Sequence, residues 1–392
     1  MTPGRAGAVG VVLAAAVAAA LVRAASAGAA ESAADPSAAA PASAETAPAP
    51  SAGKVATWQE RMAAAQALAG QGRYDKAEEV LQQALREAEG FGPDDERLVL
   101  TLNNLAGVYR MQRKYAEAAA VFRRAIERLE AADPPNRPRL ATCCNNLAMV
   151  RMEEKTDAEA EALLVRALDL REAALGPDHA ETALSVHNLA MFYLDRKRWA
   201  EAEPICRRAV AMAEKAGGPD HPEVGAALLN LAALYRERKE YDRAEPLLER
   251  ALQIARKAFP AYHPAVASAL GAQAALWSEQ GQHAKAEPLY RRVLAIDERV
   301  CGADHPSVVL ALMRLAENLC EQGKFAEAEP LLARALATHE KGLGPDHPSL
   351  AVTLENYAAL LRKMDRAEEA DRLEERARVI RAKAARDSPA VN

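Results

Sequence analysis

A 42-residue period is the feature that most constrains how this chain can fold. Histidine recurs at that interval in five similar stretches, the first of which are GPDHAET at Gly176 and GPDHPEV at Gly218. The five histidines are His179, His221, His263, His305 and His347. A period of this length indicates stacked supersecondary units, each of which buries its apolar face against its neighbours. The period therefore predicts one repeat array in place of the two or three domains that a length of 392 residues would suggest.

Alanine recurs at fixed positions of the same repeat. One column is Ala106, Ala148, Ala190, Ala232, Ala274, Ala316 and Ala358, and a second is Ala118, Ala160, Ala202, Ala244, Ala286, Ala328 and Ala370. Large apolar residues flank both columns at helical spacing, so each unit is predicted to be two antiparallel amphipathic helices joined by a short turn. Alanine at a fixed position indicates that helices approach closely there. The composition, with only 4% aromatic residues, also favours a helical body.

The N-terminal region differs in composition from the repeats. Residues 1–27 carry an apolar run after Arg5, which predicts a signal peptide or an N-terminal membrane anchor, and an Ala-rich tail without a role in export is the third interpretation. Residues 28–56 are rich in Pro, Ala and Ser and predict a disordered linker. We therefore expect residues 57–386 to form the folded array, with a disordered tail at 387–392. Export to the periplasm or cell envelope is expected, and a cytoplasmic location is the alternative.

Several function classes lack support in the sequence. The net charge of -5 gives no basic face for nucleic acid. The five cysteines show no CxxC spacing, so neither a disulfide framework nor a zinc site is indicated. Phosphate-binding glycine loops, zinc-protease motifs and nucleophile elbows are also missing. We therefore predict no catalytic residue, no metal and no cofactor, and membrane contact only through the N-terminal segment.

The GPDHP stretch is predicted to be a corner between the second helix of one unit and the first helix of the next. Gly218 suits a left-handed helix end, and Pro222 suits the first turn of the next helix. Asp220 and Glu223 have the spacing of a capping box. Packed helices lie about 10 Å apart, so successive histidines cannot share a zinc ion that needs ligands at about 2 Å. The stretch is therefore interpreted as a turn.

The repeat pattern resembles a known family. The motif L-x-x-[LN]-A-x-x-Y followed by Y-x-x-A-E-x-[LI]-[LCY]-x-R-A resembles the tetratricopeptide repeat, and the 42-residue period with NNLA and GPDHP is similar to its kinesin light chain variety. The match runs from Trp58 to Arg386, over about eight helix pairs with atypical first and last units as caps. The resemblance implies an all-α fold, a right-handed superhelical α-solenoid of stacked antiparallel helix pairs, whose first helices line a concave groove.

A polar stripe on the first helices is the candidate binding site. At about 100° of rotation per residue, it falls opposite the core residues of each helix. Its central column is Asn104, Asn146, Asn188, Asn230, Ala272, Arg314 and Asn356, and its neighbours include Asn103, Asn145 and His187. An amide both donates and accepts hydrogen bonds, which suits the backbone of an extended peptide. Alternatively the asparagines tie one first helix to the next, and both interpretations stay open.

An acidic row follows the stripe at the ends of the first helices. Its members are Glu153, Asp195, Glu237, Glu279 and Glu321. The cations that follow closely in sequence, such as Arg196 and Arg238, are predicted to neutralise this row and leave a solvated edge. A binding surface for basic partners is the alternative.

The sequence thus predicts a non-enzymatic interaction module that holds an extended peptide or a disordered tail of another protein in its groove. The alternative is a structural scaffold or an accessory subunit that assembles through the convex face or the solenoid ends. Nothing in the residues identifies the partner or the oligomeric state.

Overall fold

The computed structural model describes residues 57–92, 95–132 and 135–387, and within these ranges it contains sixteen α-helices and no strand. The predicted all-α solenoid is confirmed. The predicted leader at 1–27, the linker at 28–56 and the tail from residue 388 lie outside the described residues. Within the described ranges, every helix is too short or too polar to cross a membrane.

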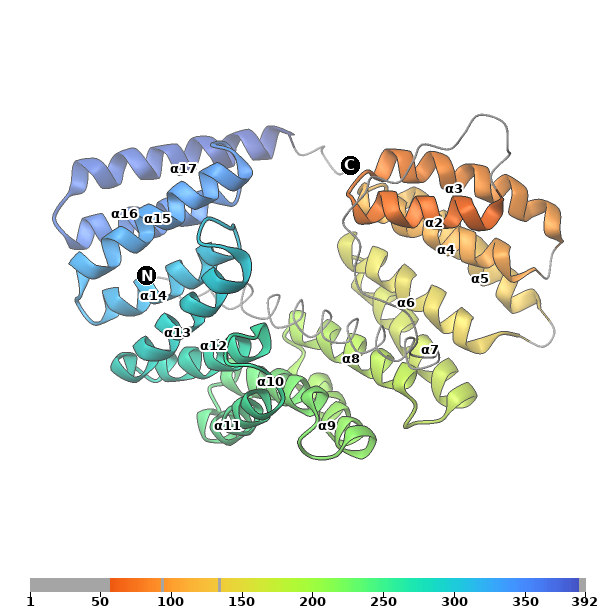
Figure 1. The fold of residues 1–392 in the computed structure, drawn as a ribbon, viewed down its shortest axis with the longest axis horizontal. Coiled ribbons are helices and arrows are strands. Elements are labelled where there is room, and N and C mark those ends of the chain that lie inside the picture. Colours follow the sequence, from red (N-terminus) through yellow and green to blue (C-terminus); the bar gives the residue numbers. More distant parts are fainter. Residues whose placement is uncertain (1–56, 93–94, 133–134, 388–392) are drawn as a thin grey trace, which may run out of the picture. The chain divides into compact units, whose positions relative to one another are not determined.

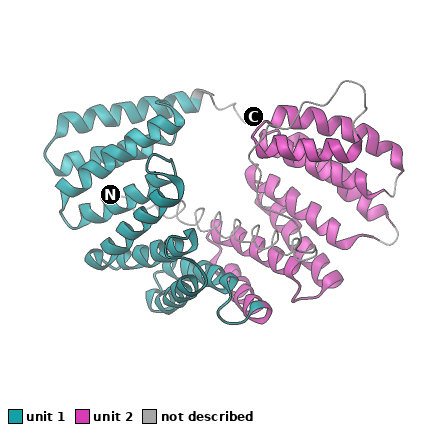
Figure 2. Ribbon diagram, viewed as in Figure 1, with its two compact units in different colours: residues 1–27, 217–392 teal, residues 28–216 magenta. Residues whose placement is uncertain are grey.

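The chain divides into two compact units, which Figure 2 distinguishes by colour. The N-terminal unit, residues 28–216, contains α2 (Trp58–Gly70), α3 (Tyr74–Ala88), the short 3-10 helix η1 (Glu89–Phe91), α4 (Glu96–Met111), α5 (Tyr115–Ala131), α6 (Arg137–Glu153), α7 (Asp157–Leu175), α8 (Ala180–Asp195) and α9 (Trp199–Gly217). The C-terminal unit, described from residue 217, contains α10 (Pro222–Glu237), α11 (Tyr241–Ala258), α12 (Pro264–Glu279), α13 (His283–Cys301), α14 (Val308–Glu321), α15 (Phe325–Leu343), α16 (Leu350–Lys363) and α17 (Ala367–Asp387).

Within each unit, consecutive helices form antiparallel pairs joined by tight turns (Figure 1). Each of these turns contains one residue with a positive φ, at the equivalent position of the repeat. That residue is glycine at Gly72, Gly281 and Gly323. Lysine takes the same conformation at Lys155 and Lys197, with φ near 60°. The turn geometry is therefore fixed by the packing of the two helices that it joins, because it persists where the residue is not glycine.

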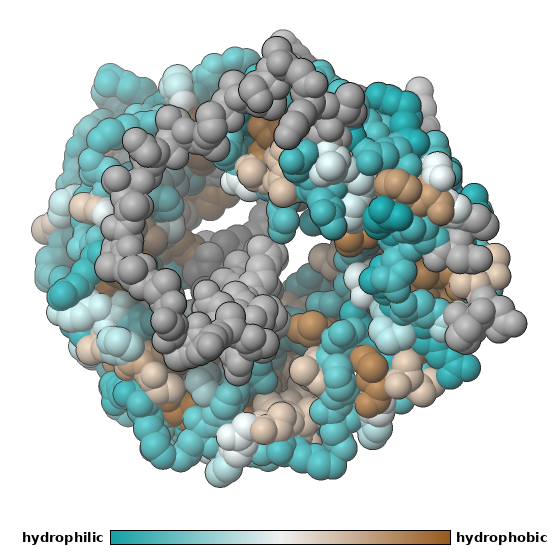
Figure 3. All heavy atoms as spheres, turned by 45° about the vertical axis from the view of Figure 1, so that its right-hand side comes forward, coloured by the Kyte–Doolittle hydropathy of each residue, from teal (hydrophilic) through white to brown (hydrophobic). Residues whose placement is uncertain are grey.

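Both predicted alanine columns lie in the core, where each alanine is at most 1% exposed. Leu102, Leu228 and Leu312 fill the space beside the first column and are equally buried. On the face of the molecule that Figure 3 shows, hydrophilic residues dominate and hydrophobic residues are scattered among them. The apolar side chains thus pack between helices, and alanine determines how closely those helices approach each other.

Enlarging one alanine in the second column is expected to strain the helix pair. Ala118 on α5 is fully buried, whereas Ala120 on the same helix is exposed. We predict that Ala118→Leu lowers the free energy of unfolding by about 1–3 kcal/mol because the core has no room for the added carbons. Ala120→Leu is the matched control and should change it by less than about 0.5 kcal/mol. Urea denaturation followed by circular dichroism measures both, and equal effects would contradict close packing at this column.

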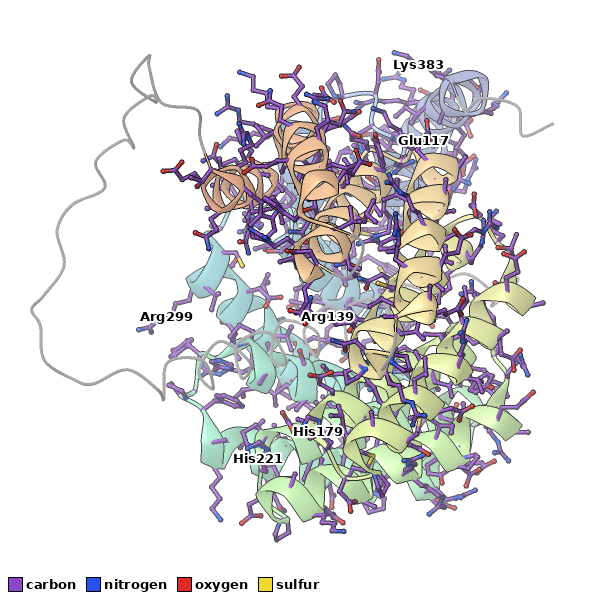
Figure 4. All side chains as sticks on the ribbon, turned by 90° about the vertical axis from the view of Figure 1, so that its right-hand side faces the viewer. Glu117, Arg139, His179, His221, Arg299 and Lys383 are labelled. Atoms are coloured by element: carbon purple, nitrogen blue, oxygen red, sulfur yellow. The ribbon has the colours of Figure 1, made fainter. Side chains whose placement is uncertain are left out.

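The five GPDHP-like stretches form corners between successive helix pairs, and at three of them histidine caps the helix that follows. His179, His221 and His263 are the N-cap residues of α8, α10 and α12, and each Nδ1 accepts a hydrogen bond from the backbone N–H two residues later, at 3.1–3.4 Å. Figure 4 labels the first two of them. The predicted capping box of Asp220 and Glu223 is therefore wrong, because the cap is the imidazole of His221.

The aspartate of the corner instead joins one helix pair to the next. Asp178 pairs with Lys215 at 2.5 Å, and Asp304 pairs with Lys341 at 2.7 Å. The same ion pair forms between Asp220 and Lys257 and between Asp346 and Lys383. The lysine always lies 37 residues later, on the second helix of the following pair. These pairs are exposed, so each contributes little to stability on its own and mainly fixes the register of stacking.

Protonation of a capping histidine should weaken its corner. The His263 ring stacks on Phe259 with centroids 4.0 Å apart, and burial lowers the pKa of His263. A lowered folded-state pKa contributes stability above the unfolded value of about 6.5, and that stability is lost as the pH falls through the folded-state pKa. We expect the unfolding free energy to fall from pH 7.5 to pH 5, and to fall less in His263→Asn, which keeps an uncharged cap. Identical pH profiles for the two proteins would rule out this role.

Candidate peptide-binding face

Three successive first helices of the N-terminal unit, α4, α6 and α8, carry the predicted polar stripe. The residues Asn103, Asn104, Asn145, Asn146, His187 and Asn188 are all half-buried, and we call this set the asparagine face. On α4 the stripe continues to Leu100 and Met111, which are 43% and 49% exposed. An exposed fraction of that size is unusual for large apolar side chains in this protein. The face therefore combines amides with accessible apolar groups.

Side-chain hydrogen bonds link the asparagines of adjacent first helices. Asn146 Nδ2 donates to Asn103 Oδ1 at 2.9 Å, and Asn188 Nδ2 donates to Asn145 Oδ1 at 2.7 Å. The asparagines thus do tie neighbouring helices together, which is one of the two roles that the sequence left open. Each bond uses one donor of one amide and the acceptor of the other.

Part of the hydrogen-bonding capacity of the face remains after these bonds are counted. An asparagine offers two N–H donors and one carbonyl acceptor. The Oδ1 atoms of Asn146 and Asn188, and the amide of Asn104, have no side-chain partner among the described residues. Because the bridges fix the orientation of the bridging amides, the unused atoms of those side chains are held in place before any ligand arrives.

Leucine and methionine border the asparagines on both sides. Leu100 and Leu184 lie four residues before Asn104 and Asn188, and Met191 lies three residues after Asn188. Neither leucine was among the site residues predicted from the sequence. The signal that could have identified them is their helical spacing from the asparagines, which puts them on the same helix face.

Three members of the acidic row pair with cations other than those predicted. Glu153 pairs with Arg110 at 2.7 Å, Glu279 with Arg236 at 3.3 Å, and Glu321 with Lys363 at 3.2 Å, so each partner belongs to a neighbouring first helix. The predicted partners are engaged elsewhere: Arg196 pairs with Asp157 and Arg238 with Glu240. The row therefore joins successive first helices, as the asparagines do.

The remaining predicted site residues lie in the C-terminal unit and are not joined in the same way. Asn230 is buried, Asn356 is exposed, and Arg314 pairs with Glu317 at 3.3 Å. The positions equivalent to Asn103 and Asn145 hold Leu229, Gly271 and Met313, none of which has an amide side chain. The asparagine bridges therefore belong to the N-terminal unit.

The described residues contain no group of three or more His, Cys, Asp or Glu side chains placed to hold a metal ion. Burial raises the pKa of Cys143 and of Cys206 to about 12. Both side chains are therefore neutral thiols at physiological pH, in the form that is a poor nucleophile.

Comparison with known proteins agrees with this architecture. A family model described as tetratricopeptide repeat matches residues 55–131, 182–257, 224–299 and 307–383, and a second model with the same description matches residues 140–181. No curated protein sequence matches the chain significantly.

Two solved structures with TM-scores above 0.5 have the same fold. BtubC (BKLC) from P. vanneervenii is 20% identical with a TM-score of 0.53, over 58% of this chain and 92% of that one. A tetratricopeptide repeat protein from Parabacteroides merdae is 17% identical with a TM-score of 0.52, over 76% and 98%. A putative kinesin light chain from Podosopora anserina is 28% identical with a TM-score of 0.47, over 52% and 97%.

The asparagine bridge can be separated from the other amides of the face by mutation. We predict that Asn146→Ala lowers the unfolding free energy by about 1 kcal/mol because one side-chain hydrogen bond is lost. Asn104→Ala is the matched control and should leave stability within about 0.5 kcal/mol. A double-mutant cycle with Asn103→Ala measures the bridge itself. Strict additivity of Asn103→Ala and Asn146→Ala would show that the bridge contributes nothing.

Proposed function

The chain belongs to the tetratricopeptide repeat family and is a repeat domain for protein–protein interaction, and on that premise we propose that the asparagine face binds an extended segment of a partner protein. The observation that carries the proposal is the pair of asparagine bridges, which leave oriented, unused amide atoms on three successive helices. The module acts by holding its partner, without catalysis.

The spacing of the face suits an extended backbone. First helices of successive pairs pack about 10 Å apart, and an extended chain advances about 3.3 Å per residue. An extended peptide would therefore cross one first helix about every three of its residues. Each new hydrogen bond to the backbone contributes about 1 kcal/mol net, so the amides hold a peptide without selecting its sequence.

Selection would come from the apolar border of the face. Leu100 and Met111 are exposed and carry no charge, so they favour apolar side chains on the partner. Four of the five acids of the acidic row pair with cations of the chain itself, so the row offers little to a basic partner. We infer an uncharged segment with spaced apolar residues. Together with the predicted leader, this suggests a partner in the cell envelope.

A photo-crosslinking experiment tests the proposed face and recovers the partner. Benzoylphenylalanine replaces Asn104 in one variant and Glu117, which is exposed on α5 and labelled in Figure 4, in the control. We expect a partner peptide to crosslink from position 104 and not from position 117. Crosslinking from both positions, or from position 117 alone, would transfer the function to another surface and favour the scaffold alternative.

The recovered peptide is then synthesised and its affinity is measured by fluorescence anisotropy. Asn104→Ala should weaken binding about fivefold, which corresponds to one hydrogen bond of about 1 kcal/mol. Glu117→Ala should leave the affinity unchanged. N-methylation of peptide amides should also weaken binding if the side-chain amides contact the peptide backbone. An affinity that is insensitive to both changes would contradict backbone recognition.

A further inference from the structure

The corner between α11 and α12 departs from the other four GPDHP-like corners. Three of the others have the sequence GPDH and one has GADH, whereas this corner reads PAYH from Pro260. Tyr262 stands where the other corners hold the aspartate that pairs with lysine. Histidine is kept, and His263 caps α12. The departure therefore changes the charge of the corner and leaves its cap in place.

The lysine partner is replaced together with the aspartate. Arg299 occupies the position that is 37 residues after Tyr262, where the other corners have Lys215, Lys257, Lys341 or Lys383. Its guanidinium lies 4.0 Å from the centroid of the Tyr262 ring, and that of Arg292 lies 4.3 Å from it. Cation–π contacts thus replace the aspartate–lysine ion pair and still join the two helix pairs.

A third substitution is not explained by this replacement. At the junctions that follow α5, α7, α13 and α15, a glutamate pairs with an arginine 36 residues later; these pairs are Glu130–Arg166, Glu172–Arg208, Glu298–Arg334 and Glu340–Arg376. The equivalent of the glutamate beside Arg292 is Arg256. The neighbouring corner holds two acids and two bases, namely Glu298, Asp304, Arg334 and Lys341. The α11–α12 corner holds three arginines and no acid.

The three arginines have no carboxylate partner among the described residues. Arg292 donates one hydrogen bond to the Ala261 carbonyl oxygen at 3.2 Å, as arginine does at other corners. Arg256 and Arg299 are exposed, and Figure 4 shows Arg299 projecting outward from the helices. The adjacent acids are already paired, because Asp220 binds Lys257 and Glu298 binds Arg334. The positive charge of this corner is therefore available to a ligand.

We propose that the corner formed by Arg256, Tyr262, Arg292 and Arg299 binds a phosphate group carried on a side chain of a partner protein. Guanidinium groups present planar N–H donors that match phosphate oxygens in pairs, and three of them balance the double negative charge of a phosphate monoester. The Tyr262 hydroxyl adds a donor, and Arg292 and Arg299 hold its pKa below the ordinary value. The start of α12 adds the positive end of a helix dipole.

This site is independent of the asparagine face, because all of its residues belong to the C-terminal unit. It also supplies what the asparagine face lacks, a group that distinguishes one chemical state of a partner from another. Phosphorylation of the partner would create the ligand, so the corner would sense a modification while the asparagine face holds a backbone.

Substitution to the residues of the other corners provides the test. The restored variant, Arg256→Glu/Tyr262→Asp/Arg299→Lys, reproduces the charged set that four corners already fold with. The transplanted variant, Glu298→Arg/Asp304→Tyr/Lys341→Arg, adds a second copy of the proposed site at the corner between α13 and α14, where Arg334 is equivalent to Arg292. Circular dichroism and the thermal midpoint verify that both variants are folded.

The probe is a fluorescent peptide, Gly-Gly-phosphoserine-Gly-Gly, measured by anisotropy at low ionic strength beside its unphosphorylated form. We expect the wild-type chain to prefer the phosphopeptide at least tenfold, the restored variant to lose that preference, and the transplanted variant to bind two peptides. The proposal is overturned if the wild type shows no preference, or if the restored variant binds as the wild type does. Inorganic phosphate that competes as well as the phosphopeptide overturns the assignment to a partner protein and makes free phosphate the ligand.

Discussion

The close approach of helices at the alanine columns is the constraint on which the rest of the structure depends. Alanine at Ala106 and Ala118, and at their equivalents, lets two helices of a pair and then two neighbouring pairs pack with no room for a larger residue. Since successive pairs repeat this contact, polar positions of one pair lie beside polar positions of the next at recurring sequence separations. Rows of like residues are a direct consequence of this repetition.

Polar side chains join the stacked pairs at three levels of the repeat. Asparagines join first helices to each other at a sequence separation of 43, glutamate–arginine pairs join second helices at 36, and corner aspartates reach lysines at 37. Each bond is weak where it is exposed. Both proposed ligand sites lie where such a bond is incomplete: the asparagine face leaves hydrogen-bonding capacity unused, and the corner at Arg256 lacks the acidic half of its pair.

Periodicity made the fold predictable from sequence, since alanine and leucine columns fix helices, pairs and corners without any knowledge of distant contacts. It did not determine which polar side chains meet. The capping prediction went wrong because Asp220 and His221 can both accept from a backbone N–H, and only the ion pair with Lys257 decides between them. The partner of Glu153 was missed for the same reason: Arg110 is distant in sequence, and stacking places it nearer than any following cation.

The repeats of one protein can be compared with each other, because equivalent positions have the same packing environment. Differences between them therefore reflect the role of the surface at each repeat. A substitution compensated at the matching position, such as Tyr262 with Arg299, preserves stacking and needs no ligand to explain it. Arg256 has no such compensation: its equivalents supply an acid that pairs with the arginine 36 residues later, and a third positive charge at one corner costs stability through repulsion between like charges. Such a cost is consistent with a site that is completed only when an anion binds, as the strained or unbalanced positions of proteins often are.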